Sequence, residues 1–140
     1  MIPDRLRAPV ALLAVGFVTT VLLSGCSGQG NAEAGNAQAA AVSFSRAVAG
    51  ATDEACGLLA PQTRKELEDR EGPCASALPA ELQSTPGPVR STEVYGKDAI
   101  VRLESDTIFL ARFRDGWQVT AAGCARAQVG RPYDCKVKGD

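Results

Sequence analysis

The amino-acid sequence predicts an α+β domain in which N-terminal helices pack on a curved antiparallel sheet of about four strands. Over residues 37–50, apolar side chains recur every three or four residues, which is the spacing of an amphipathic helix. After Pro88 the period changes to two, which is typical of strands with one buried face. Helices that precede the strands, instead of alternating with them, favour the α+β class.

The first predicted helix covers residues 37–50. Its apolar side chains lie at i, i+3, i+4 and i+7 positions, and Gly50 is a typical C-terminal stop. The residues of this apolar face are Ala37, Ala40, Ala41, Phe44, Ala47 and Val48. Residues 26–38 consist of Cys26 followed by glycine, serine, asparagine, glutamine and alanine with one charge, so we expect a flexible tether there.

Two shorter helices are expected next. Asp53 is the expected N-cap of the first, which continues through Leu59. Pro61 begins the second, residues 61–70, because proline is tolerated at the first helical position. Leu67 is its main apolar anchor, and charged side chains surround it on a solvated face.

A break and a loop separate these helices from the strands. Gly72 and Pro73 end the charged helix, and residues 73–82 predict one more helical turn, bent at Pro79. Residues 84–88 (STPGP) contain two prolines and a glycine, so they predict a loop.

Four strands are expected, over residues 89–95, 99–104, 107–114 and 117–122. Asp115 and Gly116 stand between the last two, and this pair between alternating apolar runs is a strong hairpin signal. The tail, residues 123–140, is expected to be irregular and held by its two cysteines.

The cysteines predict two disulfide bonds. The chain has five cysteines, and four remain if Cys26 carries the modification described below. Three pairings of the four are open, and we favour Cys56–Cys74 and Cys124–Cys135 because each closes a short local loop. A metal site or a catalytic thiol is the alternative, but there is no CxxC spacing and no histidine.

The start of the chain has the zones of a secretory signal peptide, residues 1–25. Arg5 and Arg7 give a positive end, and residues 10–23 form an uncharged, mostly apolar run. As a helix this run would span only about 21 Å, against a hydrocarbon core of about 30 Å. A signal peptide is therefore favoured over a transmembrane anchor.

The four residues that end this segment at Cys26, namely Leu23, Ser24, Gly25 and Cys26, resemble the lipobox of bacterial lipoproteins: an aliphatic residue, two small residues and a cysteine. In that family the cysteine receives a diacylglycerol, and the signal peptide is cut just before it. The resemblance implies fatty acyl chains such as palmitate on Cys26 and a domain held on the extracytoplasmic face of the cell membrane. An ordinary secreted protein and an uncleaved anchor are the alternatives.

The order of elements, with residues 106–110 (DTIFL) and 116–120 (GWQVT), resembles the NTF2-like (cystatin-like) α+β superfamily over residues 37–123. Eleven arginines against four lysines, with abundant alanine, are similar to small lipoproteins of unassigned role in high-GC Gram-positive bacteria. The length predicts a single domain, residues 39–140, and the resemblance implies that it forms a cone. A cystatin-like fold without a pocket is the alternative.

Little in the sequence indicates catalysis. The chain has no histidine, which excludes Ser-His and Cys-His nucleophiles, and its net charge of −1 gives no basic footprint for nucleic acid. The family's enzymes use aspartate and tyrosine, which this chain offers at Tyr95, Asp98, Asp106, Tyr133 and Asp134. The first three lie at turns, where these residues are common, and the last two lie in the tail. We therefore expect no catalytic residue, no metal ligand and no cofactor.

The expected function is that of a non-catalytic accessory or binding module, held on the membrane by its lipid and docking on an unidentified membrane or cell-wall protein. One alternative is a carrier of a small apolar ligand in the cone, for which Phe109, Phe113 and Trp117 are candidate lining residues. Aromatic residues at strand spacing are more often part of the core. The other alternative is a small isomerase-like or hydrolase-like enzyme, which needs a buried carboxylate with a raised pKa.

Overall fold

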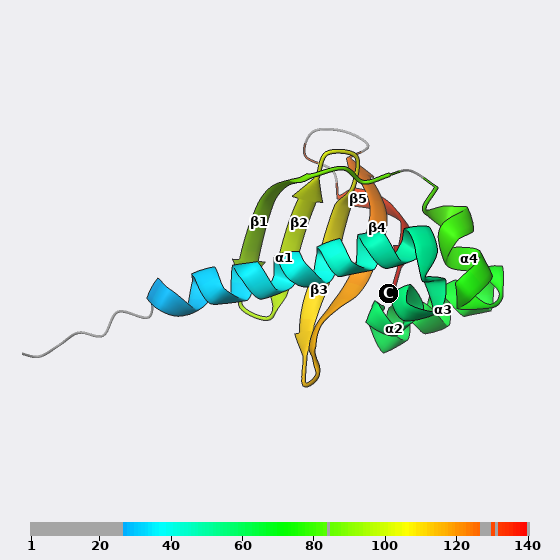
Figure 1. Ribbon diagram of the computed structural model, residues 1–140, viewed down its shortest axis with the longest axis horizontal. Helices are drawn as coiled ribbons and strands as arrows, with labels where there is room; N and C mark the ends of the chain where they lie inside the picture. Colours follow the sequence, from blue (N-terminus) through cyan, green and yellow to red (C-terminus); the bar gives the residue numbers. More distant parts are fainter. Residues whose placement is uncertain (1–26, 84, 127–129, 131, 140) are drawn as a thin grey trace, which may run out of the picture.

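The computed structural model describes residues 27–83, 85–126, 130 and 132–139, which form four helices followed by one five-stranded antiparallel sheet (Figure 1). The helices are α1 (Ser27–Gly50), α2 (Thr52–Leu58), α3 (Pro61–Glu71) and α4 (Cys74–Glu81). The strands are β1 (Val89–Tyr95), β2 (Asp98–Leu103), β3 (Thr107–Phe113), β4 (Gly116–Arg126) and β5 (Tyr133–Lys138). The α+β class is confirmed, with one strand more than predicted.

Helix α1 begins at Ser27, ten residues before the predicted start at 37. The flexible tether expected over residues 26–38 is therefore wrong from Ser27 onward. This segment contains several alanines, which have the highest helix propensity, and tertiary contacts hold it. Ala37 is fully buried, and Glu33 accepts a hydrogen bond from the indole of Trp117 in β4 at 3.0 Å.

The three short helices follow the predicted breaks closely. The N-cap of α2 is Ala51, so the prediction of Asp53 as the cap is wrong. Asp53 lies instead in the first turn of α2, where its charge faces the positive end of the helix dipole. Helix α3 begins at Pro61 as predicted, and α4 is eight residues long, with Pro79 inside it.

Both favoured disulfide pairings are present in the structure. Cys56–Cys74 joins α2 to α4, and Cys124–Cys135 joins β4 to β5. The first bridge connects two short helices, neither of which has a side-chain cap. Since short helices are marginal by themselves, this bridge and the burial of both cysteines hold the pair in place.

The strands form a meander in the order β1-β2-β3-β4-β5, each antiparallel to the next. The bounds predicted for the first three strands agree with the structure to within one residue at each end. The turn between β3 and β4 is formed by Arg114 and Asp115, one residue earlier than predicted. Gly116 then opens β4 with a positive φ of 115°, which glycine adopts readily.

The prediction of an irregular tail after residue 122 is wrong. Strand β4 continues to Arg126, and Tyr133–Lys138 adds the fifth strand at the edge of the sheet. The sequence does contain a signal for this strand, because Tyr133, Cys135 and Val137 alternate with charged residues. Val137 is fully buried, and its burial holds β5 against the core.

Helix α1 crosses one face of the sheet, and the core lies between the two layers (Figure 1). Helices α2, α3 and α4 close the end of this layer where α1 ends. The largest fully buried side chains are Phe44, Leu67, Leu78, Val101, Ile108, Leu110, Val119 and Val137. A register shift between Phe109 and Leu110 against β4 marks a bulge, which increases the local twist and curvature of the sheet.

Candidate functional site

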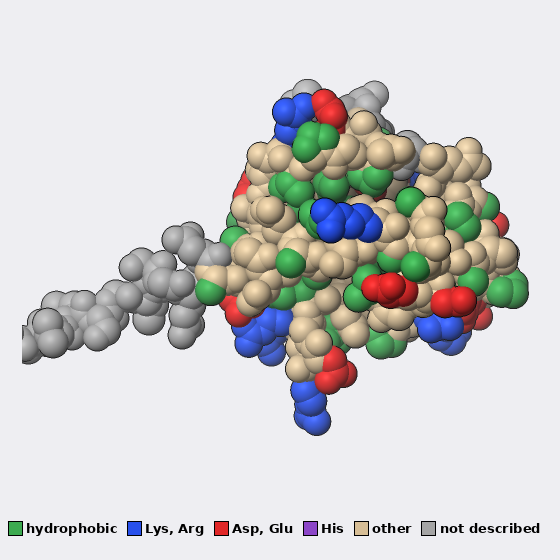
Figure 2. Space-filling model, viewed as in Figure 1, with side chains coloured by type: hydrophobic (Ala, Val, Ile, Leu, Met, Phe, Trp, Pro, Cys, Tyr) green, Lys and Arg blue, Asp and Glu red, His purple; other side chains and the backbone are tan. Residues whose placement is uncertain are grey.

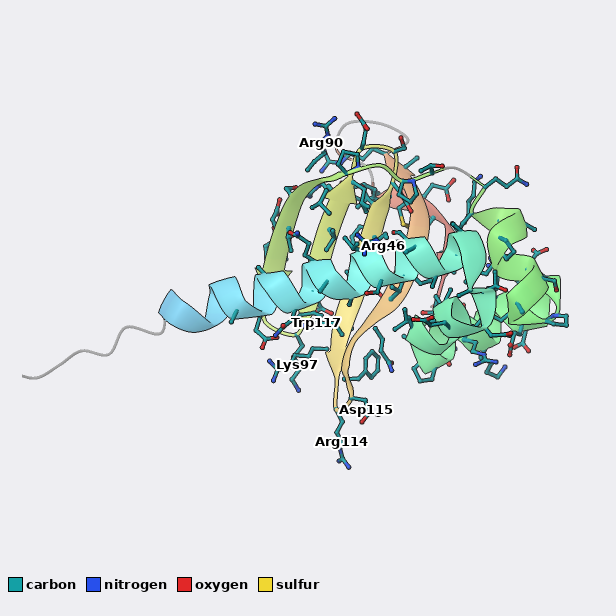
Figure 3. The ribbon with its side chains drawn as sticks, in the orientation of Figure 1. Arg46, Arg90, Lys97, Arg114, Asp115 and Trp117 are labelled. Carbon is teal, nitrogen blue, oxygen red and sulfur yellow. A yellow bond between two sulfur atoms is a disulfide. The ribbon has the colours of Figure 1, made fainter. Side chains whose placement is uncertain are left out.

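A cavity of about 780 Å³ lies between α1, the segment that links α4 to β1, and the turn between β2 and β3. Its walls are mostly apolar and come from α1, from the linking segment and from the ends of β1 and β2. These residues are Val42, Val48, Leu82, Pro86, Val89 and Leu103. Arg46, Asp106 and Lys136 supply charge at its border, and Arg46 lies on the face of α1 that is turned to the viewer (Figures 2 and 3).

The linking segment is fixed to the end of β2 by its backbone. The amides of Glu104 and Ser105 donate to the carbonyls of Pro88 and Pro86 at 3.0 and 2.8 Å. Gly87 has a positive φ of 76°, and a Cβ there would lie 2.8 Å from the Cβ of Glu104. Glycine at residue 87 therefore permits the close approach that forms this wall of the cavity.

Asp106 is a half-buried acidic group of the cavity lining. Its Oδ1 accepts hydrogen bonds from the amides of Thr107 at 2.7 Å and Cys124 at 2.9 Å, and its Oδ2 accepts one from Gly123 at 3.1 Å. Burial raises the pKa of the Asp106 carboxyl, while these three donors and the charge of Lys136 oppose that shift. The carboxylate thus ties the β2–β3 turn to Gly123 and Cys124 of β4.

Removing the Asp106 carboxyl is expected to destabilise the fold. Asp106→Ala leaves three backbone donors without their acceptor, and each buried unpaired donor costs about 1–3 kcal/mol, less where water from the cavity reaches it. Because the folded-state pKa is raised, folding of the wild type takes up a proton, and the part of the Asp106 contribution linked to that proton is lost as pH rises from the ordinary aspartate pKa of about 4 through the higher folded-state pKa. Urea unfolding of both proteins below and above that pH measures the effect.

The deficit of Asp106→Ala relative to wild type is expected to be larger at the lower pH. Asp98→Ala is the matched control, since Asp98 is an exposed carboxylate of β2. A deficit that grows instead as pH rises would contradict the assignment of a raised pKa to Asp106.

The three aromatic residues predicted to line a pocket do not line this cavity. Phe109 packs edge-on against Tyr133, with ring centroids 5.1 Å apart. Phe113 and Trp117 border a smaller hollow of about 400 Å³ near the start of α1, where Phe113 is exposed and Trp117 is buried. Phe113 and Trp117 are thus the two predicted residues that line a hollow, whereas Phe109 lies on the side of β3 opposite to the buried Ile108 and Leu110.

The other tyrosines and acids considered from the sequence lie outside the cavity. Tyr95 donates to Glu93, which also pairs with Arg102, and the two contacts lower the pKa of Glu93. The hydroxyl of Tyr133 accepts from Arg102 at 3.3 Å, which lowers the pKa of Tyr133. Asp134 is exposed on β5. Tyr95, Glu93, Arg102 and Tyr133 form a partly exposed network on the sheet, and none of them lines the cavity.

Within residues 27–139, as far as they are described, no three histidine, cysteine, aspartate or glutamate side chains gather as metal ligands would. No helix in the same part of the chain is both long and apolar enough to cross a membrane. The signal peptide predicted over residues 1–25 and the lipidation predicted at Cys26 lie outside the described residues.

No protein-family model, curated protein or solved structure matches this chain.

Proposed function

We propose that the chain is a lipid-anchored, extracytoplasmic binding module with an NTF2-like architecture, which holds a small ligand with an apolar body in the cavity beside α1. The cavity is the observation that carries this proposal. Its volume of about 780 Å³ falls in the range of small-molecule sites. Apolar walls with a few charged groups at the border are also typical of such sites.

The compartment follows from two independent features. Two disulfide bonds are in keeping with an oxidising, extracellular location. The lipobox-like residues that end at Cys26 supply the anchor. Together they support a domain that works outside the cytoplasm, on the membrane surface.

A binding role fits the cavity better than a catalytic one. The raised pKa of Asp106 is the feature that an acid–base enzyme needs, and Asp106 lies in the cavity wall. However, both carboxylate oxygens already accept backbone hydrogen bonds that hold β3 and β4 together. We therefore assign a structural role to Asp106, and an enzymatic activity remains the weaker candidate function.

Filling the cavity tests the proposal. Ser45 lines the cavity, and its hydroxyl donates only to the carbonyl of Ala41 in its own helix, at 2.9 Å. Ser45→Phe is expected to place a ring in the cavity and to lower the affinity for the fluorescent probe anilinonaphthalene sulfonate by about tenfold, which corresponds to about 1.4 kcal/mol. Fluorescence titration of the folded protein measures the change.

Ser43→Phe is the control, because Ser43 is an exposed residue of the same helix and does not line the cavity. It should bind the probe as the wild type does. Equal binding by both variants would show that the probe binds outside the cavity and would contradict the cavity as the binding site. Native mass spectrometry of wild type extracted from its own membranes then tests for a retained small molecule that Ser45→Phe lacks.

A further inference from the structure

Two hairpin turns lie side by side on the molecule and carry its exposed aromatic residues. The amide of Arg112 donates to the carbonyl of Lys97 at 2.7 Å, which joins the β3–β4 hairpin to the β1–β2 turn. We define the hairpin-tip surface as Tyr95, Lys97, Arg112, Phe113 and Arg114. Among the residues that the structure describes, Tyr95 (57% exposed) and Phe113 (42% exposed) are the large hydrophobic side chains left open to solvent. Both belong to this one surface.

The hairpin-tip surface is fastened to the first turns of α1. Glu33 accepts from the indole of Trp117 at 3.0 Å and pairs with the guanidinium of Arg112 at 3.1 Å. Helix α1 begins at Ser27, directly after Cys26. At a rise of about 1.5 Å per residue, Glu33 lies only about 9 Å along the helix axis from Ser27, the residue that follows Cys26 in the sequence. No long tether therefore separates the position of the proposed lipid from this surface.

The arrangement of the elements allows this surface to meet a plane. The start of α1 and the tip of the β3–β4 hairpin form the lower left side of the molecule as drawn, while α2, α3 and α4 lie toward the right (Figure 1). Lys97 and Arg114 point outward on that lower side (Figure 3). A membrane that holds Cys26 can therefore touch both turns without meeting the short helices.

The side chains of this surface suit a phospholipid headgroup layer. Aromatic rings favour the membrane interface, and the cationic ends of lysine and arginine reach lipid phosphates. The acidic groups nearby are Asp98, Asp115, Glu33, which pairs with Arg112, and Glu93, which contacts Tyr95 and pairs with Arg102, so the net charge is close to zero. Insertion of the two aromatic rings, more than attraction to anionic lipids, would then keep this surface in contact with the membrane.

From this geometry we infer that the hairpin-tip surface rests on the headgroups of the membrane to which Cys26 is anchored, with Tyr95 and Phe113 inserted between them. The inference depends on the lipid anchor of the proposed function. Such a contact would fix the orientation of the domain and turn the cavity beside α1 away from the bilayer surface.

Tryptophan fluorescence of the full lipidated chain tests this contact. The chain has one tryptophan, Trp117, and each of the variants Phe113→Trp, Tyr95→Trp and Gln83→Trp adds a second one to it. Residues 95 and 113 are exposed positions of the surface, whereas Gln83 is an exposed control beyond α4. Each protein is reconstituted into phosphatidylcholine vesicles with and without bromine atoms near the top of the acyl chains.

We expect bromolipid to quench the added fluorescence of Phe113→Trp and Tyr95→Trp at least about twofold more than that of Gln83→Trp. Quenching no greater than at residue 83 overturns the inference. Shielding of residues 95 and 113 from aqueous acrylamide in native membranes but not in vesicles also overturns it, in favour of a protein partner. The intact mass of the same samples shows whether the lipid is present. If the lipid is absent, the proposed function itself fails. If the lipid is present and the added tryptophans are not quenched, only the surface contact fails.

Discussion

Replacing Phe44 by alanine is expected to lower the free energy of unfolding by about 3–5 kcal/mol, because a phenylalanine ring deleted from a core leaves a cavity as well as losing its transfer energy. Phe44 is 1% exposed and is among the largest fully buried side chains. It projects from α1 into the core that α1 shares with the sheet. A loss of this size is a large share of the stability of a domain of about 100 residues. Urea unfolding under non-reducing conditions measures it.

Two further variants show that the loss comes from packing. Ser43→Ala changes an exposed neighbour on the same helix and should stay within about 0.5 kcal/mol of wild type. Phe44→Leu keeps most of the apolar volume and should lose less than Phe44→Ala. If Phe44→Ala lost less than about 1 kcal/mol, the packing of α1 on the sheet would be contradicted.

The strands were predictable because their signals are local. Alternation with period two and the pair Asp115 and Gly116 depend on residues close in sequence, and the bounds of β1 to β3 were predicted to within one residue. The disulfide pairing was predictable for the same reason, since each bridge closes a short loop. Strand β5 was missed although its alternation is visible, because three of its six residues, Asp134, Lys136 and Lys138, are charged, which weakens the apolar signal.

The start of α1 was missed for a different reason. Glycine, asparagine and glutamine in residues 27–38 favoured a linker. A helix with these residues can nevertheless be stable if one of its faces packs against the rest of the protein. That face is provided by Ala37 and by the pairing of Glu33 with β3 and β4, which are some 80 residues away in the chain. No local pattern reports such a contact.

The cavity could not be predicted from the sequence at all. Its walls come from α1, from the residues before β1 and from the end of β2, and the short loop at Pro86 and Pro88 brings them together. The aromatic residues of β3 and β4 were the natural candidates by type. Phe109 lies on the face of β3 opposite to Ile108 and Leu110, and Phe113 and Trp117 line the smaller hollow, so none of the three lines this cavity.

The largest functional effect is expected from Cys26→Ala, which removes the only sulfur that the proposed lipid anchor can use. Each buried methylene of an acyl chain contributes about 0.8 kcal/mol to membrane binding, so two or more chains hold a small domain firmly and their loss should release it. The insertion of Tyr95 and Phe113 alone is too small to replace them. We therefore expect the wild type in the membrane fraction and most of the variant in the soluble extracytoplasmic fraction.

If the signal peptide of Cys26→Ala is not cleaved, the signal peptide itself would hold this variant on the membrane. A second variant without the lipid anchor is therefore needed for comparison. In the second variant, the cleavable signal peptide of a secreted protein replaces residues 1–26, so that the mature chain begins at Ser27, where α1 begins. Intact mass identifies which start each sample has and whether it carries a diacylglycerol. If the chain that begins at Ser27 stays on membranes after a salt wash, the surface contact is stronger than the two rings allow, and a protein partner must hold it. If the intact mass of the wild type shows no lipid, the proposed anchor is wrong, and so is the orientation inferred from the short distance along α1 between Ser27 and Glu33.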